Sequence, residues 1–255
     1  AILMNGGTPK YGKLNFLDYS INWDETRKLI SQRTRMIIIN SPHNPTGSVL
    51  SEEDLKQLEK ITENTNILIL SDEVYEHIIF DHKIHQRVCR YPNLKKKSLI
   101  ISSFGKTFHT TGWKMGYVLA PQELMAEFRK IHQFIVFGVN TPIQYAVAEF
   151  MKDPENYIHL PNFYQQKRDY FCNILKNSRF NIAPSKGTYF QLLDYSRISD
   201  EKEEDFAVRL TKEFKVASIP VSVFYHKKTE NTVLRFCFAK SEETMNKAAE
   251  ILCKI

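Results

Sequence analysis

The chain has 255 residues, of which 42% are hydrophobic and 25% charged, and its formal net charge is +6. This composition matches globular proteins and excludes disordered and collagen-like classes, while the apolar runs are far too short to cross a bilayer. A chain of this length is expected to form one large or two modest domains.

The excess of positive charge is weak evidence for nucleic-acid binding, because the two tight basic runs, at 95–97 and 226–228, lack interleaved aromatic residues. The four cysteines lie far apart and do not form the pairs of zinc or thioredoxin-like sites. His82 and His85 flank a charged turn, which predicts a surface loop rather than a metal site. No permitted glycosylation sequon and no basic-then-apolar leader occur. We therefore expect a cytoplasmic protein that binds no metal, nucleic acid or membrane.

Strands and helices alternate along the first half of the chain. A short strand is expected at 14–17, and Asn22 then opens a helix that runs to Ile30. The continuous β-branched run at 36–39 is typical of a strand buried on both faces, and a second helix begins after Ser51. Further short strands are predicted at 67–70, 98–102 and 117–120. This alternation predicts a mostly parallel sheet with helices on its faces, which binds ligands beyond the carboxyl ends of its strands.

The second half shows a different pattern. Thr141 followed by Pro142 opens a helix that extends to about residue 151, and another helix is expected over 161–176. Short strands then follow, interrupted by helices, and this mixture predicts a smaller α+β domain. The strands are expected at 188–193, 216–219 and 232–238, and the helices near 203–214 and 242–252. We place the boundary near residue 155, with a large domain over 1–155 and a small domain over 156–255.

Polar residues that could carry chemistry follow the strand ends. Lys106 comes after a buried strand that ends in two hydroxyl side chains, so its amine is expected at the binding edge of the sheet. A lysine that forms an imine requires this setting. Asp72 closes the neighbouring apolar strand, where a carboxylate needs a cationic partner such as a pyridinium nitrogen. The alternatives are a solvated loop lysine and an ordinary turn at the strand end.

Four successive segments resemble motifs of the class I pyridoxal-phosphate aminotransferases. They are Ser-Pro-His-Asn-Pro-Thr-Gly at 41–47, Ser-Asp-Glu-Val-Tyr at 71–75, Ser-Ser-Phe-Gly-Lys-Thr-Phe at 102–108 and Thr-Gly-Trp-Lys-Met-Gly-Tyr at 111–117. Their order and spacing are similar to the branch of kynurenine aminotransferases, glutamine transaminase K and bacterial methionine aminotransferases. The resemblance extends over essentially the whole chain. It implies a three-layer α/β fold of fold type I and a homodimer that transfers an amino group from an amino acid to a 2-oxo acid.

The resemblance also implies roles for residues around the cofactor ring. Lys106 would bond pyridoxal 5'-phosphate as an imine and later carry the proton between Cα and C4′. Asp72 would keep the pyridine nitrogen protonated, so that the ring can accept an electron pair. Tyr75 and Asn44 would hydrogen-bond the phenolate oxygen of the cofactor and lower the pKa of the imine. Lys106, Asp72 and Tyr75 are therefore the expected catalytic residues.

Other residues would bind the phosphate and the substrate. Ser103 and Lys114 would contact the cofactor phosphate through a hydroxyl and a charge. Arg235 would clamp the substrate carboxylate through its planar fork, the alternative being a sheet arginine paired to a local acid. Asn44 would also contact the substrate, and Phe137 would reach the pocket across the dimer interface.

Three functions stay open. The first is a transaminase for sulphur-containing and aromatic amino acids, since Phe104, Phe137, Tyr189 and Phe190 are expected to give apolar pocket walls. The second is a cysteine-conjugate β-lyase, which uses the same imine and then expels a group from Cβ, or a kynurenine aminotransferase. Gly138 argues against kynurenine, because some kynurenine-active relatives carry histidine at this position. The third is a non-catalytic truncated homologue. Relative to the family, an N-terminal segment is missing that supplies a phosphate loop and an aromatic ring stacked on the cofactor.

Overall fold

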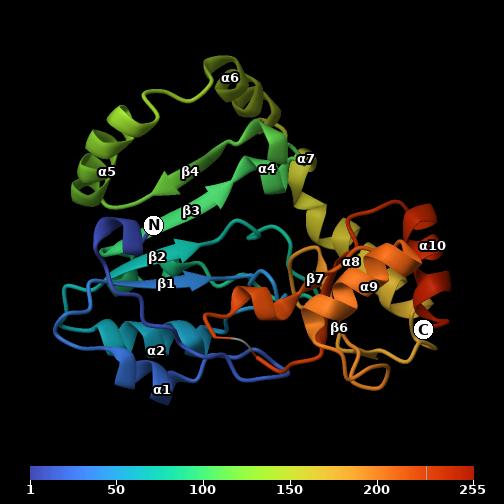
Figure 1. Cartoon of the computed structure of the whole chain (residues 1–255). Helices are drawn as coiled ribbons and strands as arrows, with labels where there is room; N and C mark the ends of the chain where they lie inside the picture. Colours follow the sequence, from blue (N-terminus) through green and yellow to red (C-terminus); the bar gives the residue numbers. More distant parts are fainter. Residues whose placement is uncertain (228) are drawn as a thin grey trace.

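A four-stranded sheet forms the centre of the first half of the chain (Figure 1). This computed structural model describes residues 1–227 and 229–255. The strands β1 (Met36–Asn40), β2 (Leu68–Asp72) and β3 (Ser98–Ser103) run parallel, and β4 (Gly116–Leu119) pairs antiparallel with β3. The register places Asn40 opposite Asp72. The expected mostly parallel sheet is confirmed, and the carboxyl ends of β1, β2 and β3 lie at one edge.

Helices α1 (Trp23–Leu29), α2 (Glu52–Thr62) and α3 (Pro92–Lys95) accompany one face of this sheet. Helix α2 begins at a complete capping box, in which Ser51 and Asp54 each accept a hydrogen bond from the other's backbone N–H. Its Leu55 and Leu58 side chains are fully buried in the apolar cluster that includes Ile39, Ile69 and Ile100.

The opposite face of β1 is open. Met36 and Ile38 are 42% and 50% exposed, whereas Ile39 is buried. Successive side chains of a strand point to opposite faces, and only one face of β1 packs against α2. The sequence prediction that this run is buried on both faces is therefore wrong for β1.

A second sheet, entirely antiparallel, lies in the second half of the chain with the strand order β5-β6-β8-β7. Its strands are β5 (Asn181–Ile182), β6 (Phe190–Asp194), β7 (Ile219–Pro220) and β8 (Val233–Cys237). It shares an apolar core with helices α8 (Leu160–Ile174), α9 (Glu203–Phe214) and α10 (Glu242–Leu252). This is the smaller α+β part that the sequence predicts. Tyr75, Ile78 and Phe80 of the first half belong to the same core, so the boundary near residue 155 stays a prediction.

The remaining elements are short or lie at the periphery. They are α4 (Phe104–Thr107), α5 (Gln122–Ile135), α6 (Thr141–Phe150), α7 (Glu155–Ile158) and the 3₁₀ turns η1 (Leu3–Asn5), η2 (Val88–Arg90), η3 (Thr111–Trp113) and η4 (Val221–Phe224). Helices α5 and α6 lie beyond β4, at the top of the view in Figure 1. Within the described ranges, no helix is both long and apolar enough to span a membrane.

Two predicted strands are corrected by the structure. The segment 14–17 forms only a single bridge, between Leu14 and Ile21, because the chain turns back on itself at Asp18, whose carboxylate accepts hydrogen bonds from Ser20. The strand expected at 216–219 is reduced to Ile219 and Pro220, and proline has no N–H to extend the ladder.

Candidate functional site

The loop that follows β1 carries Asn44 and is tied to the end of β2. The Asn40 side chain donates to the carbonyl oxygen of Asp72 at 3.0 Å and accepts from the backbone N–H of Asn44 at 2.9 Å. The backbone N–H of Ser41 donates to the same Asp72 carbonyl at 3.1 Å. One side chain therefore links two strand ends and fixes the start of the loop.

The far end of this loop packs against the second half of the chain. Gly47 has φ +70°, and a Cβ there would lie 2.6 Å from Cβ of Ser185, so only glycine fits. The backbone N–H of Lys186 donates to the Gly47 carbonyl at 3.0 Å. Within the loop, His43 Nδ1 lies 2.8 Å from Thr46 Oγ1, and burial lowers the pKa of His43 to about 4. Asn44 is thus held between both halves of the molecule.

Arg235, in the middle of β8, reaches the same loop. Its Nη1 donates to Oδ1 of Asn44 at 2.5 Å, across 191 residues of sequence. The guanidinium lies 4.0 Å from the ring centre of Phe190 and 5.2 Å from that of Phe224. Burial lowers the pKa of Arg235 from its usual value, yet arginine stays charged. Among the residues that the structure describes, no acidic side chain forms an ion pair with it, which leaves its other N–H groups for an anion.

Lys106 and Asp72 lie at the same edge of the first sheet. Lys106 is in α4, directly after β3, and its Nζ donates to the hydroxyl of Tyr189 at 3.1 Å. The same Nζ lies 5.7 Å from the ring centres of both Tyr75 and Tyr189, a distance at which cations and aromatic rings attract. Burial raises the pKa of Asp72 above its usual value, and the positive charge of Lys106 opposes that shift.

Tyr75 is 2% exposed and packs edge to face on Tyr189, with 5.2 Å between ring centres. Burial and the adjacent Tyr189 raise the pKa of Tyr75 above its usual value, so its phenol keeps its proton and acts as a donor. Ser103 ends β3, and its hydroxyl lies 3.5 Å from the carbonyl of Met115. Lys114, next to Met115, is exposed and has φ 54°.

Phe137 stands apart from these residues. It lies in the linker between α5 and α6, and its side chain is 88% exposed. Gly138, the residue after it, has no atom within 4 Å of where a Cβ would stand. Within this chain the linker therefore adds no wall beside Lys106.

Sequence reasoning missed a buried polar cluster around Glu73, the residue that follows Asp72. Glu73 is 3% exposed and accepts hydrogen bonds from the Ser71 hydroxyl at 2.9 Å and the Val88 N–H at 3.1 Å. His85 Nε2 lies 2.8 Å from its other carboxylate oxygen, and His85 is 7% exposed. The prediction of a surface loop is therefore wrong for His85. The apolar residues that follow it, such as Val88, are the signal that this loop turns back into the core.

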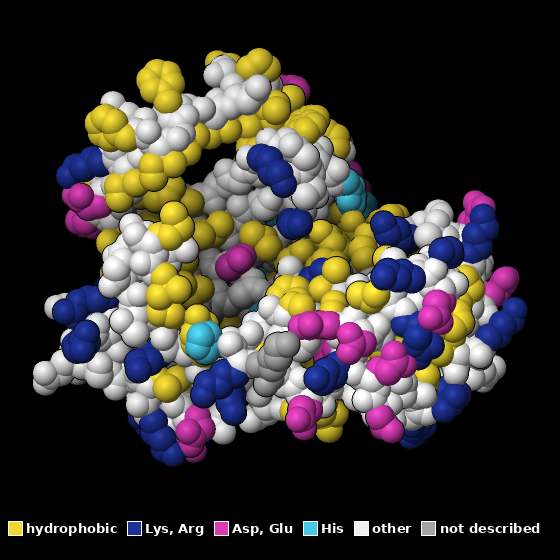
Figure 2. Space-filling model, viewed as in Figure 1, with side chains coloured by type: hydrophobic (Ala, Val, Ile, Leu, Met, Phe, Trp, Pro, Cys, Tyr) yellow, Lys and Arg dark blue, Asp and Glu magenta, His cyan; other side chains and the backbone are white. Residues whose placement is uncertain are grey.

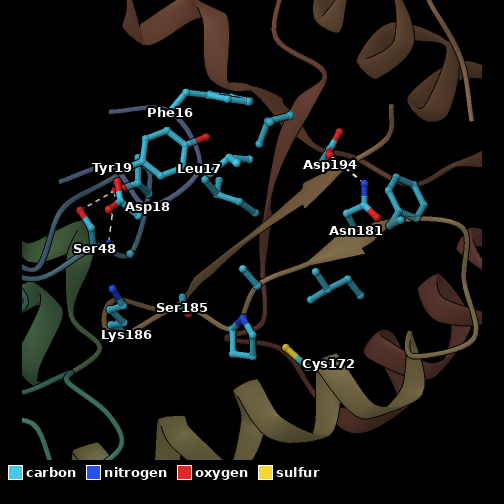
Figure 3. A pocket seen from close by; sticks show the side chains of 18 of the residues that line it. Phe16, Leu17, Asp18, Tyr19, Ser48, Cys172, Asn181, Ser185, Lys186 and Asp194 are labelled. Atoms are coloured by element: carbon cyan, nitrogen blue, oxygen red, sulfur yellow. Dashed lines mark hydrogen bonds between the residues drawn. The ribbon is translucent and has the colours of Figure 1, made fainter. Parts of the chain in front are cut away.

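A cavity of about 710 Å³ lies elsewhere, between residues 16–19 and the second sheet (Figure 3). Its charged groups are those of Asp18, Lys176, Lys186 and Asp194, and Asn181 donates to Asp194 at 2.9 Å. Lys106 and Asp72 are not part of its lining. The amine of Lys106 and the carboxylate of Asp72 lie instead at the strand ends of the first sheet, and Arg235 reaches the Asn44 loop at that edge from β8, so we place the candidate site there.

Comparisons with known proteins agree with that choice. The family model described as aminotransferase class I and II matches residues 3–252. Methionine aminotransferase of Escherichia coli is 45% identical over 253 residues, covering 99% of this chain and 66% of the relative. A solved Escherichia coli structure, reported with a methionine aminotransferase function, superposes with a TM-score of 0.96 at 44% identity, covering 99% of this chain and 67% of the other.

A kynurenine–oxoglutarate transaminase of Dictyostelium discoideum is 32% identical over 293 residues, covering 100% of this chain and 67% of the relative. The chain thus spans about two thirds of the length of these relatives.

Proposed function

Because this chain belongs to the aminotransferase class I and II family, whose members use pyridoxal phosphate, we propose that it binds this cofactor and transaminates amino acids. Its fold is the fold type I of those enzymes, so both the family and the fold class expected from the sequence are confirmed. The proposed reaction moves an amino group between a sulphur-containing or aromatic L-amino acid and a 2-oxo acid. The observation that supports this proposal most strongly is that Lys106 and Asp72 lie at one edge of the first sheet. Arg235 binds Asn44, which follows β1 at the same edge.

The residues at this edge fit the cofactor chemically. Asp72 is a half-buried carboxylate that accepts a hydrogen bond from the backbone N–H of Val74 at 3.3 Å, so a protonated ring nitrogen would satisfy its remaining charge. Oδ1 of Asn44 is occupied by Arg235, which leaves its Nδ2 to donate to the phenolate oxygen together with Tyr75. We assign the phosphate to Ser103 and Lys114. When bound, the cofactor supplies an electron sink for the pair released as the substrate Cα loses its proton.

Residues of this chain bind the substrate and move the proton. Arg235 binds the substrate carboxylate, and its stacking on Phe190 keeps the planar fork in one orientation. Lys106 would hold the cofactor through its amine, and once the substrate amine has displaced it, the free amine of Lys106 would take the proton from Cα and deliver it to C4′. Asp72 would pair its carboxylate with the protonated ring nitrogen, and the aromatic rings of Tyr75 and Tyr189 lie against the amine of Lys106 and shield it from water.

The substrate preference follows from the walls of this site. Phe190 and Tyr189 lie beside Arg235 and Lys106, whereas the ring of Phe104, in α4, packs against Phe108 and Tyr117. Apolar walls favour methionine, phenylalanine and tyrosine, and the similarity to methionine aminotransferase supports the same choice. The similarity to a kynurenine–oxoglutarate transaminase makes kynurenine the second candidate donor, against which Gly138 argues.

We further propose a cytoplasmic homodimer. Figure 2 shows hydrophobic side chains gathered over α5, α6 and their linker. The large apolar side chains exposed there are Ile131 (61%), Phe134 (87%), Ile135 (76%), Phe137 (88%) and Tyr145 (75%). Contiguous apolar surface of this kind marks an interaction site. Phe137 would reach the substrate pocket of the partner copy.

The test is a set of specificity constants for methionine, phenylalanine, kynurenine and aspartate with one common 2-oxo acid. Methionine or phenylalanine should exceed aspartate, because the aromatic walls Tyr189 and Phe190 carry no charge that could pair with a side-chain carboxylate. Aspartate above methionine would reject the apolar pocket, and kynurenine above both would reject the inference from Gly138. Pyruvate, thiol and ammonia from cysteine conjugates would identify a β-lyase instead. Failure of added pyridoxal phosphate to develop imine absorbance would identify a non-catalytic homologue.

A further inference from the structure

The turn that precedes β6 is strained. Thr188 is fully buried and has φ 65°, a backbone conformation that β-branched residues rarely adopt. Its N–H donates to the Ile78 carbonyl at 2.9 Å, and its hydroxyl accepts from the N–H of Phe190 at 3.2 Å. Gly187, just before it, bridges to Ile79. Strain of this kind persists only where the surroundings enforce it, and it is concentrated at functional sites.

The strained turn directs Tyr189 at Lys106. The phenol oxygen accepts the hydrogen bond from Nζ at 3.1 Å, which is the one polar contact of that amine within residues 1–227 and 229–255. The Tyr189 carbonyl accepts from the N–H of Phe238 at 3.1 Å, so the backbone is held on the strand side as well. The hydroxyl is therefore presented to the amine by a rigid support.

The Tyr189 ring is also fixed by its neighbours. Its centre lies 4.7 Å from that of Phe190, 5.2 Å from that of Tyr75 and 5.8 Å from that of Tyr164. Packing on several sides leaves the side chain little rotamer freedom. Lysine, by contrast, has a flexible four-carbon stem with large rotamer entropy. The rigid partner in this pair is Tyr189, and the mobile one is Lys106.

We propose that Tyr189 is a positioning residue for Lys106, whose free amine it holds whenever that amine is not bonded to the cofactor. The inference rests on the proposed function. A lysine that carries a proton between two carbon atoms must return to one place in every turnover. The Tyr189 hydroxyl accepts a hydrogen bond from the amine and from its protonated form alike. The proton passes from Cα to the amine and then from the amine to C4′, while the Tyr189 hydroxyl serves only as the acceptor that holds the amine.

The first arm of the test uses the full chain without cofactor. Tyr189→Phe removes the hydroxyl and keeps the ring. Tyr164→Phe is the matched control, because Tyr164 belongs to the same aromatic cluster but its hydroxyl bonds His109 at 3.0 Å. Labelling of Lys106 by an amine-reactive reagent is followed by mass spectrometry of the peptide. Tyr189→Phe should label about threefold to tenfold faster, the effect of losing one hydrogen bond, while the control stays close to the unchanged chain.

The second arm uses the chain loaded with pyridoxal phosphate. Tyr189→Phe should retain the imine absorbance, since the lysine itself is present. Its half-reaction with methionine should be about tenfold slower through misplacement of the amine, with an unchanged KM and a larger isotope effect for Cα-deuterated methionine. Labelling equal to that of Tyr164→Phe, or an unchanged isotope effect, would overturn the proposal. Absence of imine absorbance in the unchanged chain would instead refute the proposed function, and the cofactor-free labelling would still decide the role of Tyr189.

Discussion

Acid should destabilise the protein through His43, which lies in the loop that carries Asn44. Burial lowers the pKa of His43 from 6.5 to about 4, so the folded protein holds this imidazole uncharged. The unfolded chain takes up a proton near pH 6.5, and between pH 6.5 and 4 it binds more protons than the folded chain at this position. The contribution of the neutral His43 side chain to the stability of the folded protein is complete above pH 6.5 and is lost as the pH falls toward 4. The drop in pKa corresponds to about 3 kcal/mol of unfolding free energy.

Urea unfolding at pH 7, 5.5 and 4 measures this effect. His43→Asn keeps a polar side chain within reach of Thr46 but cannot titrate, and His82→Asn, at an exposed position, is the control. When the pH is lowered from 7 to 4, the free energy of unfolding of the unchanged chain and of the control should each fall by about 3 kcal/mol more than that of His43→Asn. If the free energy of unfolding changed with pH in the same way for all three proteins, His43 would not be held neutral in the loop, and the reasoning would fail.

Three further predictions concern the candidate site and the buried cluster around Glu73. Arg235→Ala should lower kcat/KM by about 30-fold to several-thousand-fold for amino donor and oxo acid alike, because both present a carboxylate; steady-state kinetics equal to the parent would contradict the clamp. Burial raises the pKa of Asp72, so the folded state binds this proton more readily and stability declines as the pH rises above 3.8. Asp72→Asn should therefore raise the Tm of the cofactor-free chain at pH 7, with no gain below pH 3.8, and a Tm lowered at pH 7 would refute this. Glu73→Ala leaves three donors unpaired, among them His85, and should lower the free energy of unfolding in urea by about 3 kcal/mol; a loss no larger than that of the exposed control Glu250→Ala would show that the cluster is not stabilising.

The sheet edge could be predicted because its strands are short apolar runs with polar residues directly after them. The parallel order brings the ends of β1, β2 and β3 together, so Asn40, Asp72 and Ser103 follow from local pattern and topology. Contacts between distant segments could not be predicted from pattern. The hydrogen bond from Arg235 to Asn44 depends on how the second sheet packs on the first, and the bond from Lys106 to Tyr189 depends on the turn at Thr188.

Helix α5 shows a different limit of sequence reasoning. It has no side-chain hydrogen bond at its N-terminus, and its apolar residues, such as Phe134, lie exposed rather than against a core. No capping signal marks its start, although Leu124, Phe128, Ile131 and Ile135 recur at the helical spacing i, i+4, i+7 and i+11. His85 was misjudged for the opposite reason, since its polar neighbours in sequence conceal a buried contact with Glu73.

The central claim is that Lys106 is the residue that bonds the cofactor. Incubation of the 255-residue chain with pyridoxal phosphate, borohydride reduction and peptide mapping by mass spectrometry tests it most directly. We predict a single reduced adduct on Lys106 that disappears, with the visible absorbance, in Lys106→Ala while the fold is retained. An adduct on any other lysine, or none at all, would contradict the account.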